Sequence, residues 1–428
     1  MTNNRGSWAV KVFFRTVIIF FATAGAVAFT SAAGAKAGDL TEADVKVIHD
    51  RLFTVDSHVD IPLNYTETPQ TDPGQASDMQ VDLGKMQKGG LDSGFFIVYV
   101  GQTERTPENY AGAKADALRK FSLIHRMTDE LYPDRIGLAY HPDEVDSIAA
   151  SGRKVAMIGI ENGFVIGKDL SLLEKYYDLG GRYMTLAHMG HNDICDTSTP
   201  SEELGDDEEE HGGLSAFGRE VIDEMNRLGM MVDVSHISEK SMRQAIAHSK
   251  APVIASHSSV RALADHPRNL TDDQMRLLAE HGGVVQIVAL SAYIKVDPAR
   301  RAAYQALEAK VAAAYGDAEF DEARHENTPE MKQGLEELDR DFPKATVSQY
   351  VDHIDHAVKV MGIDHVGISS DFGGGGGIVG WDNAAETENV TRELLSRGYG
   401  EKDIAKIWSG NLLRVWRQVE NVAKGQGD

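Results

Sequence analysis

The sequence of 428 residues contains only one cysteine, Cys195. An intrachain disulfide is therefore impossible, which excludes the small disulfide-stabilised folds of many secreted proteins. We expect this side chain to be a buried, unreactive thiol, and a disulfide-linked dimer is the alternative. Positive charge is also scarce, because 43 Lys and Arg face 66 Asp and Glu, for a formal net charge of −23. A surface of this sign repels nucleic acid and anionic lipid, so neither is expected as a partner.

Long apolar runs are absent except near the N-terminus. Three cations in the first 15 residues precede an uncharged apolar run over residues 17–29, and small side chains follow over residues 31–35. This order is typical of a bacterial secretory signal peptide over residues 1–35, with cleavage near residues 35–37. The run is short for a membrane-spanning helix, which needs about 20 residues. We therefore expect a periplasmic or secreted protein without a stable membrane anchor after cleavage.

The remaining chain is long enough for one large domain, which we place at residues 41–421. Eight short and mostly continuous apolar runs predict strands that are covered on both faces. These runs are residues 53–55, 94–100, 155–160, 183–187, 230–235, 253–256, 283–289 and 365–369. Helical patterns separate them, some with a capping box, as at residues 41–44 and 271–274. The alternation predicts an α/β fold, a (β/α)8 barrel of the TIM type, with a doubly wound open sheet as the alternative.

Three segments interrupt this alternation. The charged segment at residues 295–345 has helical composition and lies between the seventh and eighth predicted strands. We expect it to be a helical insertion that serves as a lid or a dimer contact. The acidic segment at residues 197–213 is expected to be a solvated loop. Five glycines at residues 373–377 lack the Gly-Lys-Ser or Gly-Lys-Thr end of a phosphate-binding loop, so we expect a loop at the rim of the barrel and no bound nucleotide.

Metal-binding side chains stand at the ends of four predicted strands. His58 and Asp60 follow the first strand, Glu161 the third, His236 the fifth and His257 the sixth. In a parallel barrel the carboxyl ends of the strands surround one cavity. We therefore expect a site for two metal ions, with Glu161 as a bridge between the His58–Asp60 pair and the two later histidines. Donors of this kind suit two Zn²⁺ ions, and Mn²⁺, Co²⁺ or Fe²⁺ are alternatives.

Two ions that share a water generate a hydroxide near neutral pH and polarise a carbonyl oxygen, which is hydrolase chemistry. Asp371 ends the eighth predicted strand and is expected to take a proton from the water and pass it to a leaving amine. His188 ends the fourth and is expected to donate to the oxygen that gains negative charge. Arg268 follows His257 on the next loop and suits a substrate carboxylate. The alternative role is a turn or helix cap for Asp371, a buried structural residue for His188 and a surface residue for Arg268.

The segments that carry these residues resemble the membrane (renal) dipeptidase family of zinc peptidases. The likeness covers most of residues 45–420. Its segments are residues 56–60, 159–163, 181–188, 217–220, 225–229, 232–238, 251–259, 268–269 and 364–372. Together with the predicted signal peptide, the resemblance implies an exported bacterial member of this family.

The resemblance also implies a function and a set of roles. It implies a metallo-dependent hydrolase barrel that cleaves L-L and also L-D dipeptides, by a hydroxide that bridges two zinc ions. Asp371 would transfer the proton, and His188 would contact the oxygen of the scissile bond. Arg268 would hold the C-terminal carboxylate of the substrate together with Tyr293. The implied ligands are His58, Asp60, Glu161, His236 and His257, and many members of the family are homodimers.

The sequence departs from the family pattern at places that concern substrate preference. Asn162 stands where the family usually has glycine. Residues 197–213 and 295–345 are longer than their counterparts in mammalian members, and the five glycines replace the usual Asp-Gly after the last strand. None of these differences removes a predicted metal ligand, so they concern the preferred dipeptide and leave the metal chemistry in place.

Two other functions agree with the same residues. One is a binuclear-metal hydrolase of another amide, a lactone or a phosphoester. Related barrels of that kind commonly use His-x-His on the first strand and a bridging lysine on the fourth, whereas this chain has His58-x-Asp60 and no lysine in residues 183–188. The other is a metal-binding protein without turnover, for which the three additional polar residues would have no role. The dipeptidase is therefore the preferred interpretation.

Overall fold

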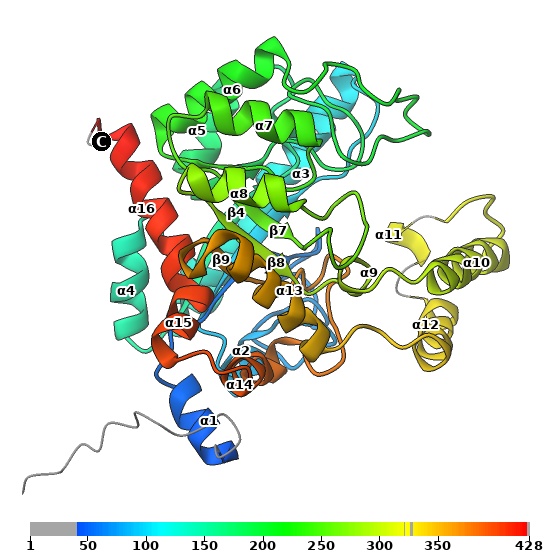
Figure 1. Ribbon diagram of the computed structural model, residues 1–428. Helices are drawn as coiled ribbons and strands as arrows, with labels where there is room; N and C mark the ends of the chain where they lie inside the picture. The colour runs from blue at the N-terminus through cyan, green and yellow to red at the C-terminus, as the bar shows by residue number, and fades with distance from the viewer. Residues whose placement is uncertain (1–40, 321, 326–327, 426–428) are drawn as a thin grey trace, which may run out of the picture.

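The computed structural model describes residues 41–320, 322–325 and 328–425. The predicted signal peptide at residues 1–35 lies outside the described residues. The centre of the fold is a parallel sheet that curves into a nearly closed barrel, with helices around it (Figure 1). Its strands, in spatial order, are β1 (Val55–Asp60), β2 (Ser93–Tyr99), β4 (Lys154–Glu161), β5 (Gly181–Thr185), β6 (Met231–Asp233), β7 (Ile254–Ser258), β8 (Val284–Val288) and β9 (Val366–Ser369). A further strand, β3 (Ile136–Leu138), pairs with β4 outside this order.

The barrel closes where its first and last strands meet. The amide of Asp60 donates to the carbonyl oxygen of Phe372 at 2.8 Å, and a parallel bridge joins Val59 to the same residue. The amide of Ser370 donates to the carboxylate of Asp56 at 2.9 Å. These contacts join the two ends of the sheet, so the predicted (β/α)8 barrel is confirmed and the open sheet is wrong.

The strand boundaries predicted from apolar runs are wrong in two places. The run at residues 53–55 predicts a strand that ends at Val55, whereas β1 begins there and continues to Asp60. Polar residues can occupy this buried strand because they find partners inside the barrel; Ser57 Oγ, for example, donates to the carbonyl oxygen of Ser256 at 2.6 Å. The sequence also fails to predict β3, since three residues are too few to form a recognisable apolar run.

The helices include those whose starts the sequence predicts. Capping boxes are present at Thr41 and Thr271, where each threonine side chain accepts from a backbone N–H of the first turn. No helix of the described residues combines the length and apolar composition that crossing a membrane requires. The α-helices are α1 (Glu42–His49), α2 (Leu83–Gly89), α3 (Pro107–His125), α4 (Pro142–Ala150), α5 (Ser171–Asp178), α6 (Ala216–Leu228), α7 (Glu239–His248), α8 (Asp272–Glu280), α9 (Ser291–Ile294), α10 (Pro298–Ala314), α11 (Glu322–His325), α12 (Pro329–Asp341), α13 (Val347–Met361), α14 (Glu388–Ser396), α15 (Glu401–Ala405) and α16 (Asn411–Ala423).

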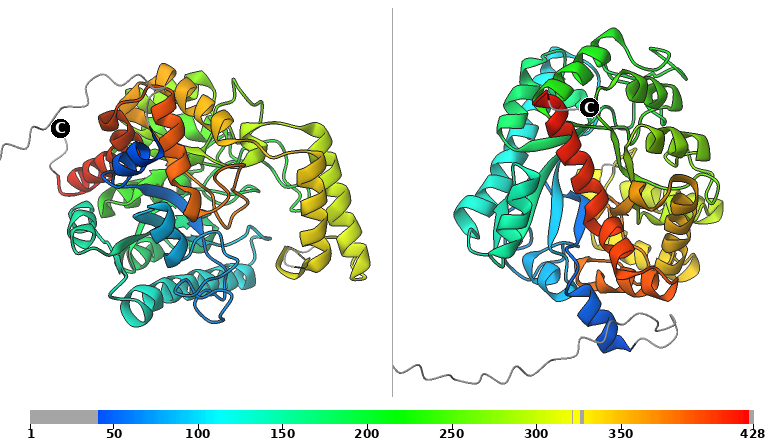
Figure 2. Two further views of the ribbon diagram at one scale, coloured as in Figure 1. Left: turned by 90° about the horizontal axis from the view of Figure 1, so that it is seen from below. Right: turned by 60° about the vertical axis from the view of Figure 1, so that its left-hand side comes forward.

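The described residues between 295 and 345 form a helical arm that stands away from the barrel (Figure 1, Figure 2). Within the arm, α10 and α12 pack on each other around a small apolar cluster of their own, made of Leu307, Val311 and Met331. The predicted helical insertion between the last two barrel strands is therefore confirmed. Its role as a lid or as a dimer contact stays a prediction.

Cys195 is fully buried, and burial raises the pKa of its thiol. We therefore expect the native protein not to react with a thiol reagent such as DTNB, because the reagent needs an accessible thiolate. After unfolding in guanidinium chloride, absorbance should report about one thiol per chain. Rapid labelling of the native protein, or a dimer that separates on reduction, would contradict the burial of this side chain.

Candidate active site

The predicted metal ligands meet at the carboxyl-terminal end of the barrel. His58 and Asp60 lie on β1, Glu161 ends β4, His236 follows β6 and His257 lies on β7. Their donor atoms form overlapping groups in which all atoms lie within 4.8 Å of one another, namely His58 with Asp60 and Glu161, Glu161 with His236 and His257, and His58 with His257 and Asp371. The barrel thus brings together every residue that the sequence predicts as a ligand.

Glu161 lies at the centre of this cluster, with its two oxygens facing different neighbours. Oε2 lies 3.4 Å from Nε2 of His58. Oε1 lies 3.0 Å from Nε2 of His236 and 3.3 Å from Nε2 of His257. A carboxylate oriented in this way can serve two ions at once, one through each oxygen.

Hydrogen bonds behind the rings orient two of the histidines. Nδ1 of His58 lies 3.0 Å from the hydroxyl of Tyr183. This hydroxyl donates to the carbonyl oxygen of Ser57 at 2.9 Å. Nδ1 of His257 lies 2.8 Å from Ser256 Oγ, which donates to Asp233 at 2.6 Å. Because each hydroxyl already donates elsewhere, each Nδ1 must be the donor, and the proton sits on that nitrogen. Nε2 of the neutral His257 ring then carries a lone pair toward the cluster, and Nε2 of His58 faces the cluster as well and becomes a ligand atom once it has lost its proton.

The cluster has the donors and the charge that divalent cations need. Burial lowers the pKa of His236 and His257 well below the usual range, so both rings are neutral. Burial also disfavours a charged His58, but Glu161 and Asp60 outweigh it and raise the pKa of His58 well above its usual value. Nε2 of His58 and Oδ1 of Asp60 are buried without a hydrogen-bond partner among the described residues. Three imidazoles and two carboxylates with orphaned donor atoms therefore fit a pair of divalent metal ions.

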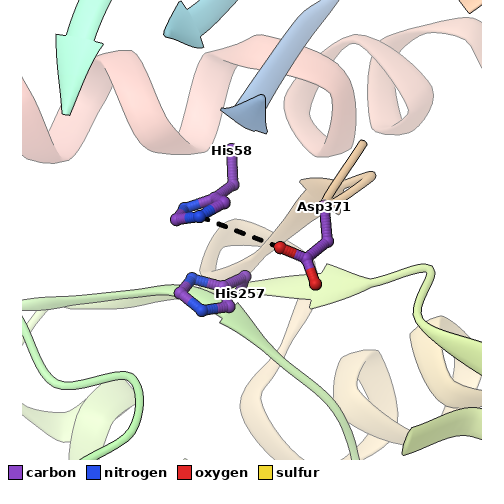
Figure 3. A group of neighbouring side chains, drawn as sticks. All are labelled: His58, His257 and Asp371. Carbon is purple, nitrogen blue, oxygen red and sulfur yellow. Dashed lines mark ion pairs between the residues drawn. The ribbon is translucent and has the colours of Figure 1, made fainter. Parts of the chain in front are cut away.

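Asp371 lies just beyond β9 and faces this cluster. Figure 3 shows its side chain and those of His58 on β1 and His257 on β7 pointing toward one another. Its Oδ1 lies 3.8 Å from Nε2 of His58. Burial raises the pKa of Asp371 to about 8, against the opposing effect of His58. A carboxyl group in this pKa range can both accept and release a proton near neutral pH.

The five-glycine segment at residues 373–377 lets the backbone pass close to Asp371. A Cβ on Gly374 would collide with the carboxylate of Asp60, and one on Gly376 would collide with backbone of the strand end. Gly373 also has a positive φ of 83°. Larger residues would therefore displace the rim loop from the acid that it supports.

His188 lies beside the predicted ligands but belongs to none of the groups whose donor atoms all lie within 4.8 Å of one another. Its Nε2 is 3.7 Å from Oε1 of Glu161, and its ring lies 4.1 Å from that of His236, centroid to centroid. On its other side the ring of Tyr99 lies 4.8 Å away, with its hydroxyl 3.5 Å from Nδ1 of His188. Burial lowers the pKa of His188, so the ring is neutral and can donate a single N–H.

Arg268 and Tyr293 lie together on the side of the cluster that follows β7 and β8. Arg268 is buried, and its Nη2 donates to the carbonyl oxygen of His257 at 3.1 Å. Its guanidinium carbon lies 5.4 Å from the centroid of the Tyr293 ring, and its Nε has no hydrogen-bond partner among the described residues. Tyr293 lines the cavity, whereas Arg268 lies beside that ring and outside the lining.

A cavity of about 690 Å³ joins these side chains. Its size lies in the range of small-molecule pockets, about 300–1,000 Å³. Glu161, His188, Asp371 and Tyr293 all line it, and so does Lys332 from the helical arm. The predicted catalytic and binding residues therefore border one space of suitable size, with Arg268 directly behind its wall.

Two residues of this wall are missed by sequence reasoning. Tyr99 ends β2, and Lys120 extends from α3 with only 7% of its surface exposed. Burial lowers the pKa of Lys120, while the charges of Asp60 and Glu161 counteract that shift. A lysine within a helix is ordinarily a surface residue, so its type alone gives no signal.

The rim of the cavity contains strained backbone. Asn162, His236 and Asp371 all have positive φ angles, of 75°, 68° and 60°, a region that favours glycine. Asn162 is held there by its own side chain, which accepts from the amide of Phe164 at 3.1 Å and donates to the carbonyl oxygen of Val100 at 3.1 Å. Such strain persists where the surrounding structure demands one geometry, and it gathers at functional sites.

The comparisons with known proteins agree on one family. The family described as Membrane dipeptidase (Peptidase family M19) matches residues 42–427 of this chain. Dipeptidase tcpJ of Claviceps purpurea is 32% identical over 351 residues, which cover 81% of this chain and 71% of that protein. Dipeptidase ataJ of Aspergillus terreus is 32% identical over 396 residues, which cover 87% of this chain and 86% of that protein.

Solved structures have the same fold. The probable dipeptidase PvdM from Pseudomonas aeruginosa is 33% identical with a TM-score of 0.77, and the match covers 88% of this chain and 98% of that one. A metallopeptidase from Rhodobacter sphaeroides, solved with a phosphinate mimic of the dipeptide L-Ala-D-Ala, is 22% identical with a TM-score of 0.65, over 86% and 99% of the two chains. At that lower identity the likeness concerns the fold.

The strain at Asn162 leads to a prediction of relative stability. Asn162→Ala should lower the free energy of unfolding by about 1–3 kcal/mol, because it loses both hydrogen bonds and keeps a Cβ at positive φ. Asn162→Gly loses the same bonds but relieves the backbone, so it should lower this free energy less. Urea unfolding followed by circular dichroism measures both variants. A glycine variant less stable than the alanine variant would show that backbone strain is not the deciding factor here.

Proposed function

Because the chain belongs to the membrane dipeptidase family, peptidase family M19, it is a metallodipeptidase, and we propose that it hydrolyses dipeptides at two divalent metal ions bridged by Glu161. The observation that carries this proposal is the orientation of the Glu161 carboxylate, whose two oxygens face separate sets of donors. We propose Zn²⁺ as the metal, with Mn²⁺, Co²⁺ or Fe²⁺ as alternatives that suit the same donors.

The proposed ligands divide between the two ions. His58 and Asp60 would hold one ion, His236 and His257 the other, and Glu161 both. When bound, such ions lower the pKa of a water molecule and polarise a carbonyl oxygen. The hydrogen bonds behind His58 and His257 would keep the rings oriented before an ion arrives, which reduces the ordering that binding requires.

We assign the transfer of the proton to Asp371. Its carboxyl group faces the cluster, and burial raises its pKa to about 8. It would accept a proton from the attacking water and release it to the nitrogen of the leaving amino acid as the peptide bond breaks. His188, which is neutral and lies beside Glu161, would donate its N–H to the carbonyl oxygen of the scissile bond.

We assign the C-terminal carboxylate of the substrate to Arg268 and Tyr293. The guanidinium has an unpartnered Nε, and the tyrosine beside it lines the cavity. A buried guanidinium binds a carboxylate strongly and can fix its direction through two parallel hydrogen bonds. We propose that both L-L and L-D dipeptides are substrates.

A panel of substrates and one variant test the proposal. Purified protein loaded with zinc should release amino acids from L-L and L-D dipeptides faster than it cleaves a lactone or a phosphoester. Glu161→Gln should lower the bound metal from about two ions per chain to less than one, measured by mass spectrometry of the metal, and reduce kcat/KM by about 10³-fold or more.

The matched control is Glu280→Gln, which changes an exposed acid at the end of α8 and should alter neither value. If metal-loaded protein cleaves no dipeptide, the proposed function is wrong. If Glu161→Gln loses one ion and retains the other at full occupancy, the bridging assignment is wrong.

Arg268→Met should reveal the carboxylate site. For a dipeptide with a free C-terminus, kcat/KM should fall by about 10–100-fold, since a hydrogen bond between charged groups contributes about 1.5–3 kcal/mol. For the C-terminal amide of the same dipeptide, kcat/KM should fall less, because the amide carries no charge for the guanidinium to bind. Arg276→Met, at an exposed position on α8, is the control for the loss of a positive charge. Equal losses for the acid and the amide would contradict the assignment.

A further inference from the structure

We propose that the part of the cavity wall formed by Lys120 and Tyr99 selects dipeptides whose N-terminal residue has an acidic side chain. This inference rests on the dipeptidase function proposed above and adds a substrate class to it. None of the residues assigned to metal binding, proton transfer or carboxylate binding takes part in this wall.

Lys120 is a buried cation that no described residue pairs at ion-pair distance. It lines the cavity with 7% of its surface exposed. Its ammonium lies 5.7 Å from the centroid of the Tyr99 ring, close enough for a weak cation–π contact. It forms no hydrogen bond and no ion pair with another residue of the described parts of the chain. Buried lysines are almost always paired, so an anion that enters the cavity is the expected partner.

The nearby carboxylates do not fill that role. Asp60, Glu161 and Asp116 act on Lys120 through space, but none of the three lies within ion-pair distance of its ammonium. Asp60 and Glu161 are among the proposed metal ligands, so bound ions would neutralise their charge. Lys120 would then remain the unpaired cation of its side of the cavity.

A row of ring contacts leads from the metal cluster to Lys120. The ring of His236 lies 4.1 Å from that of His188, and the ring of His188 lies 4.8 Å from that of Tyr99. The ammonium of Lys120 follows at 5.7 Å from the Tyr99 ring. Lys120 therefore lies one side chain, that of Tyr99, beyond His188, which we assign to the scissile carbonyl. A substrate side chain next to that carbonyl can span this distance.

The order of the strands decides which substrate residue reaches Lys120. Tyr99 ends β2, and α3, which carries Lys120, packs on β2. Arg268 follows β7, and three strands separate β2 from β7 in either direction around the barrel. The lysine wall and the carboxylate site thus lie on opposite sides of the metal cluster. A dipeptide with its C-terminus at Arg268 and its peptide bond at the cluster places its N-terminal residue toward Lys120.

The cavity is also lined by buried apolar side chains, together with polar ones from the segment after β1, such as Asn64, Gln70 and Asp78. Val59, Ile61, Tyr65 and Phe96 line the cavity and are buried, with Val59 on β1 and Phe96 on β2. The other lysine of the lining, Lys332, is exposed on the helical arm. An N-terminal Glu or Asp would pair with Lys120, whereas a neutral side chain would leave the ammonium without a charged partner.

The test compares two α-linked dipeptides of equal shape, Glu-Leu and Gln-Leu, with zinc-loaded wild-type protein. We expect kcat/KM for Glu-Leu to exceed that for Gln-Leu by roughly 10–100-fold, as for one hydrogen bond between charged groups. This comparison needs no variant, so it does not depend on whether a substituted protein folds. A ratio near one would overturn the inference.

Variants and a reversed pair locate the effect. Lys120→Met should bring the ratio to within about threefold of one, whereas Lys114→Met, on the same helix but outside the cavity lining, should keep the wild-type ratio. For Leu-Glu and Leu-Gln, Lys120→Met should leave their ratio as it is in the wild-type protein, since the charge then lies at the other end. A Lys120→Met ratio equal to the wild-type ratio would overturn the assignment to this residue.

The outcomes separate this inference from the proposed function. If metal-loaded protein cleaves none of the four dipeptides or the wider panel, the dipeptidase proposal fails. If it cleaves Gln-Leu as well as Glu-Leu, the dipeptidase stands and only the acidic preference is wrong.

Discussion

The candidate active site depends on one buried carboxylate held among four histidines. Burial alone would raise the pKa of Glu161, but the charge of His58 and the contacts with the other three imidazoles hold this pKa well below the usual range. A buried anion is tolerated only where partners compensate its charge. Glu161 is thus kept ionised, with both oxygens available, at the wall of the cavity. A neutral or displaced side chain at this position would leave the histidines around it without a common partner.

The protein stabilises this arrangement from behind and from the rim. Tyr183 and Ser256 bind the outer nitrogens of two histidines, and Asp233 accepts from Ser256, so the rings are held facing the cluster. At the rim, His236 and Asp371 keep their positive φ angles although neither is glycine. Strain of this kind costs about 1–3 kcal/mol for each residue, which the well-packed barrel can offset. The protein is therefore less stable than it could be, because a few side chains are held in strained positions, as is common at active sites.

The barrel could be predicted because buried parallel strands appear as continuous apolar runs, and its ligands because they stand where those runs end. The extent of β1 could not be predicted this way, since its polar residues are buried through hydrogen bonds that only the folded barrel supplies. Lys120 could not be predicted as a cavity residue for another reason, because its charge suggests a surface position. The one signal is its alignment with Ala113 and Ala117 on the buried face of α3. The positive φ of Asn162 likewise depends on partners that are distant in the sequence.

The contact between the first and last barrel strands has a consequence for the making of the protein. The amide of Ser370 and the carboxylate of Asp56 are joined across 314 positions of the sequence, and His58 and Asp371 face each other from the same two ends of the sheet. A ribosome must therefore release nearly the whole chain before these groups can meet. A nascent or truncated chain that stops before β9 has no complete centre, so competence for catalysis appears only when synthesis and folding have both finished.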